Sequence, residues 1–217
     1  RMTASSLTNA AMVTSDFEAC LDRAWAAKTR DHTPPQHSRW ANAANGMSIA
    51  VPDDIFQMTT WVLEEQRDWF EDEIHFVRKL VQPGDQTLDI GANHGVYTLS
   101  MAQAVGVEGR VVAFEPSHLT AQRLRASVER NGLSQVTVVE AALSKENGQA
   151  TLFTGASSEL SSLHDIQSGP SAARAHETVQ VFSLDRWEEA RKLASISFIK
   201  LDAEGEEVNV LSGAERV

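Results

Sequence analysis

Short apolar runs and longer amphipathic segments alternate along the second half of the chain, and this alternation predicts the fold. Apolar runs at 86–90, 110–115 and 136–140 have the length of buried strands. The segments between them, at 95–105 and 118–130, have the length and polarity of helices. Strands that alternate with helices indicate a parallel sheet that is covered on both faces. We therefore predict an α/β fold with a doubly wound, mostly parallel sheet.

Further elements follow the third run. A fourth apolar run at 196–201 predicts another strand, and a helix is expected to begin near Val208. Between the third and fourth runs, alternating segments at 149–154 and 178–183 predict an inserted β-hairpin. Ser117 is the expected N-cap of the second helix.

The first part of the chain has a different pattern. Residues 1–60 are predicted to form an N-terminal extension of helix and loop, ahead of a main domain at 61–217. Asp16 is a candidate cap for a helix that runs to about Arg30. The polar stretch that follows, to about Asn45, is interpreted as a loop.

The main domain is predicted to begin with one long amphipathic helix at about 60–81. Phe70, Ile74, Val77 and Val81 recur at helical spacing, so they mark the face that is expected to be buried.

Charge and composition narrow the choice of partners. The formal net charge is −11, and Lys and Arg form no cluster, so we expect no nucleic-acid partner. The sequence has no apolar stretch of membrane-spanning length and no visible signal peptide, so no membrane partner is expected. The single cysteine, Cys20, excludes an internal disulfide and favours a cytoplasmic location. A homo-oligomer stays open.

Two of the predicted strands end in a carboxylate. Asp89 precedes a turn that contains Gly91 and Gly95, and Glu115 ends the next strand. Gly91 allows the backbone to turn sharply, and Gly95 allows it to approach a ligand closely. A carboxylate at the second tip can accept hydrogen bonds from both hydroxyls of a ribose. This arrangement predicts a Rossmann-like nucleoside pocket at the carboxyl ends of adjacent strands.

The same turn distinguishes between nucleoside cofactors. A nicotinamide fingerprint needs a glycine where Asn93 stands, with helix amides facing a pyrophosphate. Asp89 would repel a pyrophosphate but suits S-adenosyl-L-methionine, which carries an amino group and a sulfonium and no phosphate. Electrostatics therefore favours S-adenosyl-L-methionine. Two alternatives stay open: a nicotinamide-dependent oxidoreductase, and a non-catalytic module that binds S-adenosyl-L-methionine or a partner protein.

Four motifs stand in the order seen in FkbM-family methyltransferases, which the chain resembles over about residues 69–217. They are Asp89-Ile90-Gly91-Ala92-Asn93-x-Gly95, Phe114-Glu115-Pro116, Ala142-Leu143-Ser144 and Ile199-Lys200-Leu201-Asp202-Ala203-Glu204-Gly205. The resemblance implies a class I S-adenosyl-L-methionine-dependent fold and methylation of a hydroxyl on a sugar or another small molecule. It implies these cofactor positions: Asp89, Gly91 and Asn93 near the methionine moiety, with Gly95 in the same turn, Glu115 on the ribose, and Glu140, Ala141 and Ala142 beside adenine.

The fourth motif carries the candidate catalytic residues. Methyl transfer to an alkyl hydroxyl needs an aligned oxygen and a base that takes its proton. Asp202 or Glu204 is the candidate base, and Lys200 would fix the carboxylate or the substrate. The alternative is that the three residues form a structural ion-pair network. No metal site is expected, although Asp202 as one ligand of Mg²⁺ stays open.

Other residues near these motifs have less certain roles. His94 is a candidate contact to substrate or cofactor, and the Ser-rich stretch at 157–162 is a candidate wall of the acceptor pocket. Trp61, Trp69 and Trp187 are interpreted as packing residues. A complete class I sheet has more strands than the four core strands predicted here, so its C-terminal strands are expected to lie outside this sequence, because proteins avoid a bare edge strand.

Overall fold

The computed structural model describes residues 33–43, 45–154, 161–163, 175–187 and 195–217. The predicted helix at 16–30 and most of the Ser-rich stretch at 157–162 lie outside the described residues. The chain divides into two compact units, 1–33 and 34–217, and the description below concerns the second.

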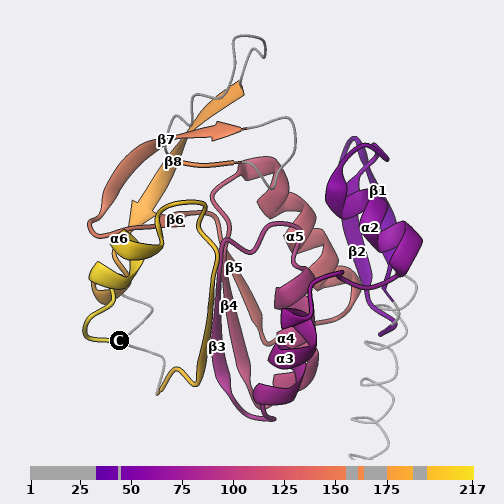
Figure 1. The fold of residues 1–217 in the computed structure, drawn as a ribbon, viewed down its shortest axis with the longest axis horizontal. Coiled ribbons are helices and arrows are strands. Elements are labelled where there is room, and N and C mark those ends of the chain that lie inside the picture. The colour runs from indigo at the N-terminus through magenta and orange to yellow at the C-terminus, as the bar shows by residue number, and fades with distance from the viewer. Residues whose placement is uncertain (1–32, 44, 155–160, 164–174, 188–194) are drawn as a thin grey trace, which may run out of the picture. The chain divides into compact units, whose positions relative to one another are not determined.

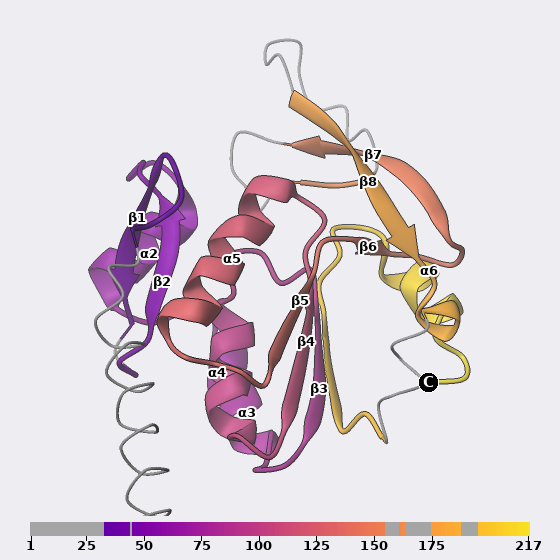
Figure 2. The ribbon, with the colours of Figure 1, turned by 180° about the vertical axis from the view of Figure 1, so that it is seen from behind.

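A four-stranded parallel sheet forms the centre of this unit (Figures 1 and 2). Its strands are β3 (Gln86–Ile90), β4 (Arg110–Phe114), β5 (Val136–Val139) and β9 (Phe198–Leu201). All four were predicted, and all four are confirmed. Their spatial order is β5-β4-β3-β9, so the chain adds strands first on one side of β3 and then on the other. Parallel sheets bind ligands at such a switch point.

Helices cover the sheet on both faces, as the alternating pattern predicted. The helices α4 (Val96–Val105) and α5 (His118–Arg130) follow β3 and β4 in the chain. They lie on one face together with α3 (Glu73–Leu80), whereas α6 (Glu207–Ser212) lies on the other (Figures 1 and 2). Ser117 occupies the N-cap position of α5 as predicted, but its side chain makes no capping hydrogen bond.

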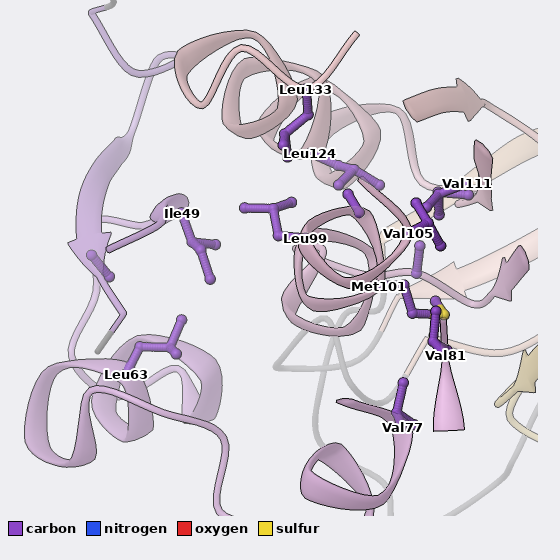
Figure 3. Packing of buried hydrophobic residues seen from close by; sticks show 14 of the residues in the cluster. Ile49, Leu63, Val77, Val81, Leu99, Met101, Val105, Val111, Leu124 and Leu133 are labelled. Atoms are coloured by element: carbon purple, nitrogen blue, oxygen red, sulfur yellow. The ribbon is translucent and has the colours of Figure 1, made fainter. Parts of the chain in front are cut away.

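The alternation of side chains along β4 separates two hydrophobic clusters. Val111 and Ala113 belong to the larger cluster, beneath α4 and α5, which Figure 3 shows around Leu99 and Leu124. Val112 and Phe114 belong to the cluster on the opposite face. Because both faces of β4 are fully buried, its sequence is a continuous apolar run rather than an alternating one.

The inserted hairpin is confirmed, with one addition. Strands β7 (Gly148–Thr154) and β8 (Ala175–Phe182) pair antiparallel, and the short strand β6 (Ala142–Leu143) pairs parallel to β8. They form a separate three-stranded sheet, which stands beyond the carboxyl ends of the central strands (Figure 1).

The stretch that was interpreted as a loop up to Asn45 contains a strand, so that prediction was wrong. Strands β1 (Ser38–Asn42) and β2 (Ser48–Pro52) form an antiparallel pair. Side chains of α5 hold this pair: Ser127 Oγ accepts a hydrogen bond from the Ala50 amide at 2.9 Å, and Asn131 Oδ1 accepts one from the Ser48 amide at 2.9 Å. The strands therefore depend on contacts with distant residues.

The single helix predicted at 60–81 is also wrong, because it is broken into two. The helix α2 (Met58–Gln66) ends where Arg67 adopts a left-handed conformation with φ of 55°, and α3 begins only at Glu73. Asp68, in the break, forms two 2.7 Å hydrogen bonds with the Arg78 guanidinium. This bidentate pair stabilises the break, in which residues 67–72 lie outside both helices.

Within the described residues, no helix combines the length and the apolar character that a membrane crossing requires.

Candidate active site

A cavity of about 290 Å³ lies at the carboxyl ends of the four parallel strands. This volume is near the lower end of the range for small-molecule sites. Its wall includes the start of α2, the α2–α3 break, the turn after β3, the tips of β4, β5 and β9, and part of the hairpin sheet. The predicted site residues that line it are Gly91, Asn93, Glu115, Ala141, Ala142, Lys200, Asp202 and Glu204. Asp89, Gly95 and Glu140 do not.

The two glycines of the turn have different tasks. Gly91 has φ of 75°, and a Cβ at this position would lie 1.8 Å from the Asp202 carbonyl oxygen. Gly91 therefore allows the turn after β3 to pack against the tip of β9. Gly95 was expected to approach a ligand, but a Cβ there would lie 2.3 Å from Leu124 Cδ1. Gly95 thus allows α4 to pack against α5, and its close approach to a ligand stays a prediction.

Glu115 is held by the backbone of its two neighbouring segments. Its side chain accepts a 2.8 Å hydrogen bond from the Asn93 amide on Oε2 and a 2.9 Å bond from the Ser117 amide on Oε1. Burial raises the pKa of Glu115 to about 7, although these two hydrogen bonds oppose the rise. Nearby, the buried Asn93 Oδ1 accepts no hydrogen bond from any described residue, so it can accept one from a ligand.

At the tip of β5, the structure separates three residues that were expected beside adenine. Ala141 and Ala142 are buried and line the cavity. Glu140 instead pairs with Arg125 and His118, each at 2.7 Å. Burial opposes the ionised form of Glu140, but these two partners outweigh it and lower its pKa. Glu140 is therefore a member of an ion-paired group, and its contact with the cofactor stays a prediction.

Asp89 is not among the residues that line the cavity, and its contact with the cofactor stays a prediction. Its side chain is fully buried and accepts a hydrogen bond from the Thr98 hydroxyl. The Lys200 ammonium lies 3.9 Å from Asp89 Oδ1. Burial raises the pKa of Asp89, and the charge of Lys200 opposes that rise.

Lys200 connects this buried carboxylate with the cavity. Its ammonium donates a 3.1 Å hydrogen bond to the Gly91 carbonyl and another, also at 3.1 Å, to Asp202 Oδ2. The Asp202 side chain is 61% exposed and lines the cavity, and no described residue bonds its Oδ1. The tip of β9 therefore presents a carboxylate that is held in place and still has a free oxygen.

The loop after Asp202 is shaped by its own acidic residues. Glu204 has φ of 48°, and its carbonyl accepts a 2.8 Å hydrogen bond from Ser162 Oγ. Glu207 accepts bonds from the Ala203 amide at 2.8 Å and the Gly205 amide at 3.1 Å. These and its own amide lower the pKa of Glu207. The loop thereby joins the β9 tip to the hairpin sheet.

Trp69, Glu71 and Tyr97 are among the cavity residues that the sequence reasoning did not identify. Glu71 Oε2 accepts a 2.8 Å hydrogen bond from the Trp69 indole and a 2.9 Å bond from the Tyr97 hydroxyl. The sequence predicts one helix at 60–81 and a packing role for Trp69, whereas the structure places Trp69 in the break between α2 and α3. Two features of the sequence could have indicated these residues. Tyr97 is the only tyrosine and stands just after the glycine turn, and Glu71 lies in a cluster of acidic residues.

The remaining candidate residues, a histidine, two serines and two tryptophans, differ in whether they line the cavity. His94, 1% exposed, lines the cavity. Ser161 and Ser162 line it as well and are the described part of the Ser-rich stretch. Trp187 is a core residue, as predicted, whereas Trp61 is 48% exposed. Among the residues that the structure describes, no group of three or more His, Cys, Asp or Glu side chains is arranged to hold a metal ion.

A parallel sheet with a switch point, a glycine turn and a ribose-type carboxylate defines an α/β protein that binds a nucleoside cofactor. Comparison with known proteins specifies the family. The Methyltransferase FkbM domain matches residues 89–217. The chain therefore belongs to the FkbM methyltransferase family, as the motifs predicted, and carries a methyltransferase domain that uses S-adenosyl-L-methionine.

Individual relatives are similar only over part of their length. Ribosomal protein L11 methyltransferase from Chloroflexus aurantiacus is 37% identical over 71 residues, which are 32% of this chain and 21% of that protein. An O-methyltransferase from Bacillus cereus, solved in complex with S-adenosylhomocysteine, is 33% identical with a TM-score of 0.30, over 33% of this chain and 34% of that one.

A further solved structure is similar over part of the chain. A proposed rRNA methylase from Clostridium thermocellum is 22% identical, with a TM-score of 0.32, over 33% of this chain and 39% of that one. The expectation that the chain has no nucleic-acid partner stays a prediction from its charge and from the absence of a Lys and Arg cluster.

Proposed function

We propose that the chain transfers a methyl group from S-adenosyl-L-methionine to a hydroxyl oxygen of a small molecule or sugar. The observation that carries the proposal is the Lys200–Asp202 pair at the tip of β9. Asp202 lines the cavity, and its partner strand β3 carries the cofactor turn. A general base must lie within hydrogen-bond reach of the acceptor and beside the transferable group, and the position of Asp202 on the cavity wall supports this role.

The cavity wall has the groups that this cofactor needs. Each Glu115 oxygen accepts one amide hydrogen bond and keeps a lone pair for a ribose hydroxyl. Asn93 Oδ1 supplies a further acceptor, and Ala141 and Ala142 leave space for the base. When bound, the cofactor supplies the methyl group: a C–O bond forms as the C–S bond of the sulfonium breaks, and the electron pair stays on sulfur.

The residues of the chain manage the proton. Asp202 accepts the proton of the acceptor hydroxyl on its free Oδ1 and releases it to water, because its side chain is largely exposed. Lys200 donates a hydrogen bond to Asp202 Oδ2 and so holds the carboxylate in one orientation, which leaves Oδ1 available to the acceptor. His94 and Glu204 form the neighbouring wall, where the acceptor would be in contact. We place the reaction in the cytoplasm, since the chain has a single cysteine.

The test separates binding from turnover. S-adenosylhomocysteine binding is measured by calorimetry, and methyl transfer is measured on a panel of sugars and other hydroxyl compounds. Asp202→Asn should bind S-adenosylhomocysteine normally and lose activity by about 100-fold or more, which is the contribution of a general base. Glu108→Gln is a matched control, because this exposed carboxylate lies outside the cavity. An Asp202→Asn variant with full activity would contradict the role of Asp202, and transfer to nitrogen or carbon acceptors alone would contradict O-methylation.

A further inference from the structure

We propose that Glu71 binds the amino group at the methionine end of the cofactor, with Trp69 and Tyr97 holding its carboxylate in place. The inference rests on the proposed function, since it assumes S-adenosyl-L-methionine in the cavity. It adds a cofactor-binding residue that stands 18 positions ahead of the start of the family match at residue 89.

The order of the strands sets the direction in which the cofactor lies. Glu115 follows β4, and Ala141 and Ala142 follow β5, so the nucleoside side of the cavity is at the β4–β5 end of the sheet. Lys200 is on β9, at the other end, and its ammonium lies 5.2 Å from the centre of the Tyr97 ring. The amino-acid tail of a cofactor whose nucleoside is at the β4–β5 end therefore extends toward Tyr97.

Glu71 stands at this second end. Its Oε2 is bonded by both Trp69 and Tyr97, and no described residue bonds its Oε1. A carboxylate that is fixed by two donors on one oxygen and free on the other suits a protonated amine. The aromatic rings of Trp69 and Tyr97 add favourable surroundings for a cation.

The other carboxylates on the cavity wall either form hydrogen bonds with other residues or lie away from the Tyr97 end of the cavity. Glu115 lies at the nucleoside end, and Asp202 is paired with Lys200. Glu206 accepts hydrogen bonds from Ser144 and Asn209. Glu204 lies in the loop that is bonded to Ser162, at the hairpin side. Glu71 is therefore the carboxylate best placed for the tail.

Two ligands that differ only in the tail test the proposal. S-adenosylhomocysteine carries the amino-acid group, and 5′-methylthioadenosine lacks it. Calorimetry should show that Glu71→Gln weakens S-adenosylhomocysteine binding by about tenfold or more, the loss expected for one hydrogen bond to a charged group. Binding of 5′-methylthioadenosine should change by less than about twofold, which also shows that the variant is folded.

Control variants separate this effect from others. Glu73→Gln removes the same charge from the start of α3, outside the cavity wall, and should leave both ligands unaffected. Glu115→Ala should weaken both. Tyr97→Phe removes one donor to Glu71 and should weaken S-adenosylhomocysteine alone.

Three outcomes would overturn the proposal. Equal loss of both ligands in Glu71→Gln would make Glu71 a structural residue. Unchanged binding of both ligands, with a raised KM for the methyl acceptor, would assign Glu71 to the acceptor site. If the unchanged chain bound neither ligand, the proposed function itself would fail, and this inference with it.

Discussion

Asp89 and Lys200 are register partners on the neighbouring strands β3 and β9, and their charged groups lie 3.9 Å apart. The carboxylate is fully buried, whereas the ammonium reaches the cavity wall. Lys200 also bonds Asp202, so one cation stands between a buried carboxylate and the proposed base. Asp89 therefore supports Lys200 electrostatically, and its predicted contact with the cofactor is a separate question that ligand binding would test.

Removing the cation should therefore destabilise the fold in a pH-dependent manner. Lys200→Met leaves Asp89 buried without its partner, which costs about 3 kcal/mol of unfolding free energy at pH 8. Burial already raises the pKa of Asp89, and the loss of Lys200 raises it further. Because a protonated Asp89 needs no cation, the cost should shrink as the pH falls.

Urea unfolding of both chains at pH 5 and pH 8 measures this difference. The double variant Lys200→Met with Asp89→Asn is the control, since it removes both charges and should recover most of the lost stability. A cost that is the same at both pH values would contradict the pairing of Asp89 with Lys200.

Cofactor binding should depend on pH through Glu115. The ionised carboxylate accepts hydrogen bonds from ribose hydroxyls, and burial raises the pKa of Glu115 to about 7. S-adenosylhomocysteine should therefore bind about tenfold more weakly at pH 6 than at pH 8, since most of the carboxylate is protonated at the lower pH. In the ligand-free chain the sign is opposite: the stability that Glu115 contributes is fully present below its ordinary pKa and is lost as the pH rises through 7.

Calorimetric titration at half-unit pH steps follows both protonation states. Glu115→Gln should bind weakly at every pH and show a flat profile between pH 6 and 8. If that variant kept the slope of the unchanged chain, another group would have to be responsible.

The glycine at the end of β3 should be intolerant of any side chain. Gly91→Ala places a Cβ 1.8 Å from the Asp202 carbonyl oxygen, in addition to the strain of its positive φ. Gly84→Ala is the matched control, because Gly84 has φ of 87° and nothing within 4 Å of its would-be Cβ. We expect Gly84→Ala to cost about 1–2 kcal/mol, the penalty of the left-handed backbone alone. Gly91→Ala should cost at least about 2 kcal/mol more in the same urea experiment.

Residues that hold the break between α2 and α3 should affect binding of the cofactor's methionine end even where they do not line the cavity. Arg78 lies off the cavity wall and bonds Asp68, next to Trp69 in the chain. Arg78→Gln should lower stability by about 1–2 kcal/mol and weaken S-adenosylhomocysteine more than 5′-methylthioadenosine. Lys79→Gln, on the same helix, should change neither. Equal weakening of the two ligands would show that the Asp68–Arg78 pair supports the whole domain rather than this one wall.

Much of the central sheet could be predicted because short apolar runs alternate with amphipathic segments, most clearly at β4, which is buried on both faces. The same logic located Gly91, Glu115 and Asp202, since functional side chains of a parallel sheet follow the strand tips. Helix α5 matched its predicted bounds because its amphipathic pattern is regular. These features are set by residues close together in sequence.

The parts that escaped prediction depend on distant contacts. Strand β1 is polar in sequence and is held partly through β2 by α5, while the break after α2 is stabilised by Arg78, ten residues after Asp68. The turn residues Asp89 and Gly95 matched a cofactor motif, yet their side-chain positions face Lys200 and Leu124. A motif specifies which residues are needed but not which of them face the ligand.

The α2–α3 break contributes to the cavity although it lies outside the part of the chain that matches the family. The family match begins at residue 89, whereas Met58, Trp69 and Glu71 form part of the cavity wall. A fragment trimmed to residues 89–217 would retain all four motifs and lose one side of the cavity, so bulk water would reach the bound tail. Expression trials and chimeras between relatives should therefore carry residues 34–88 together with the domain that follows them.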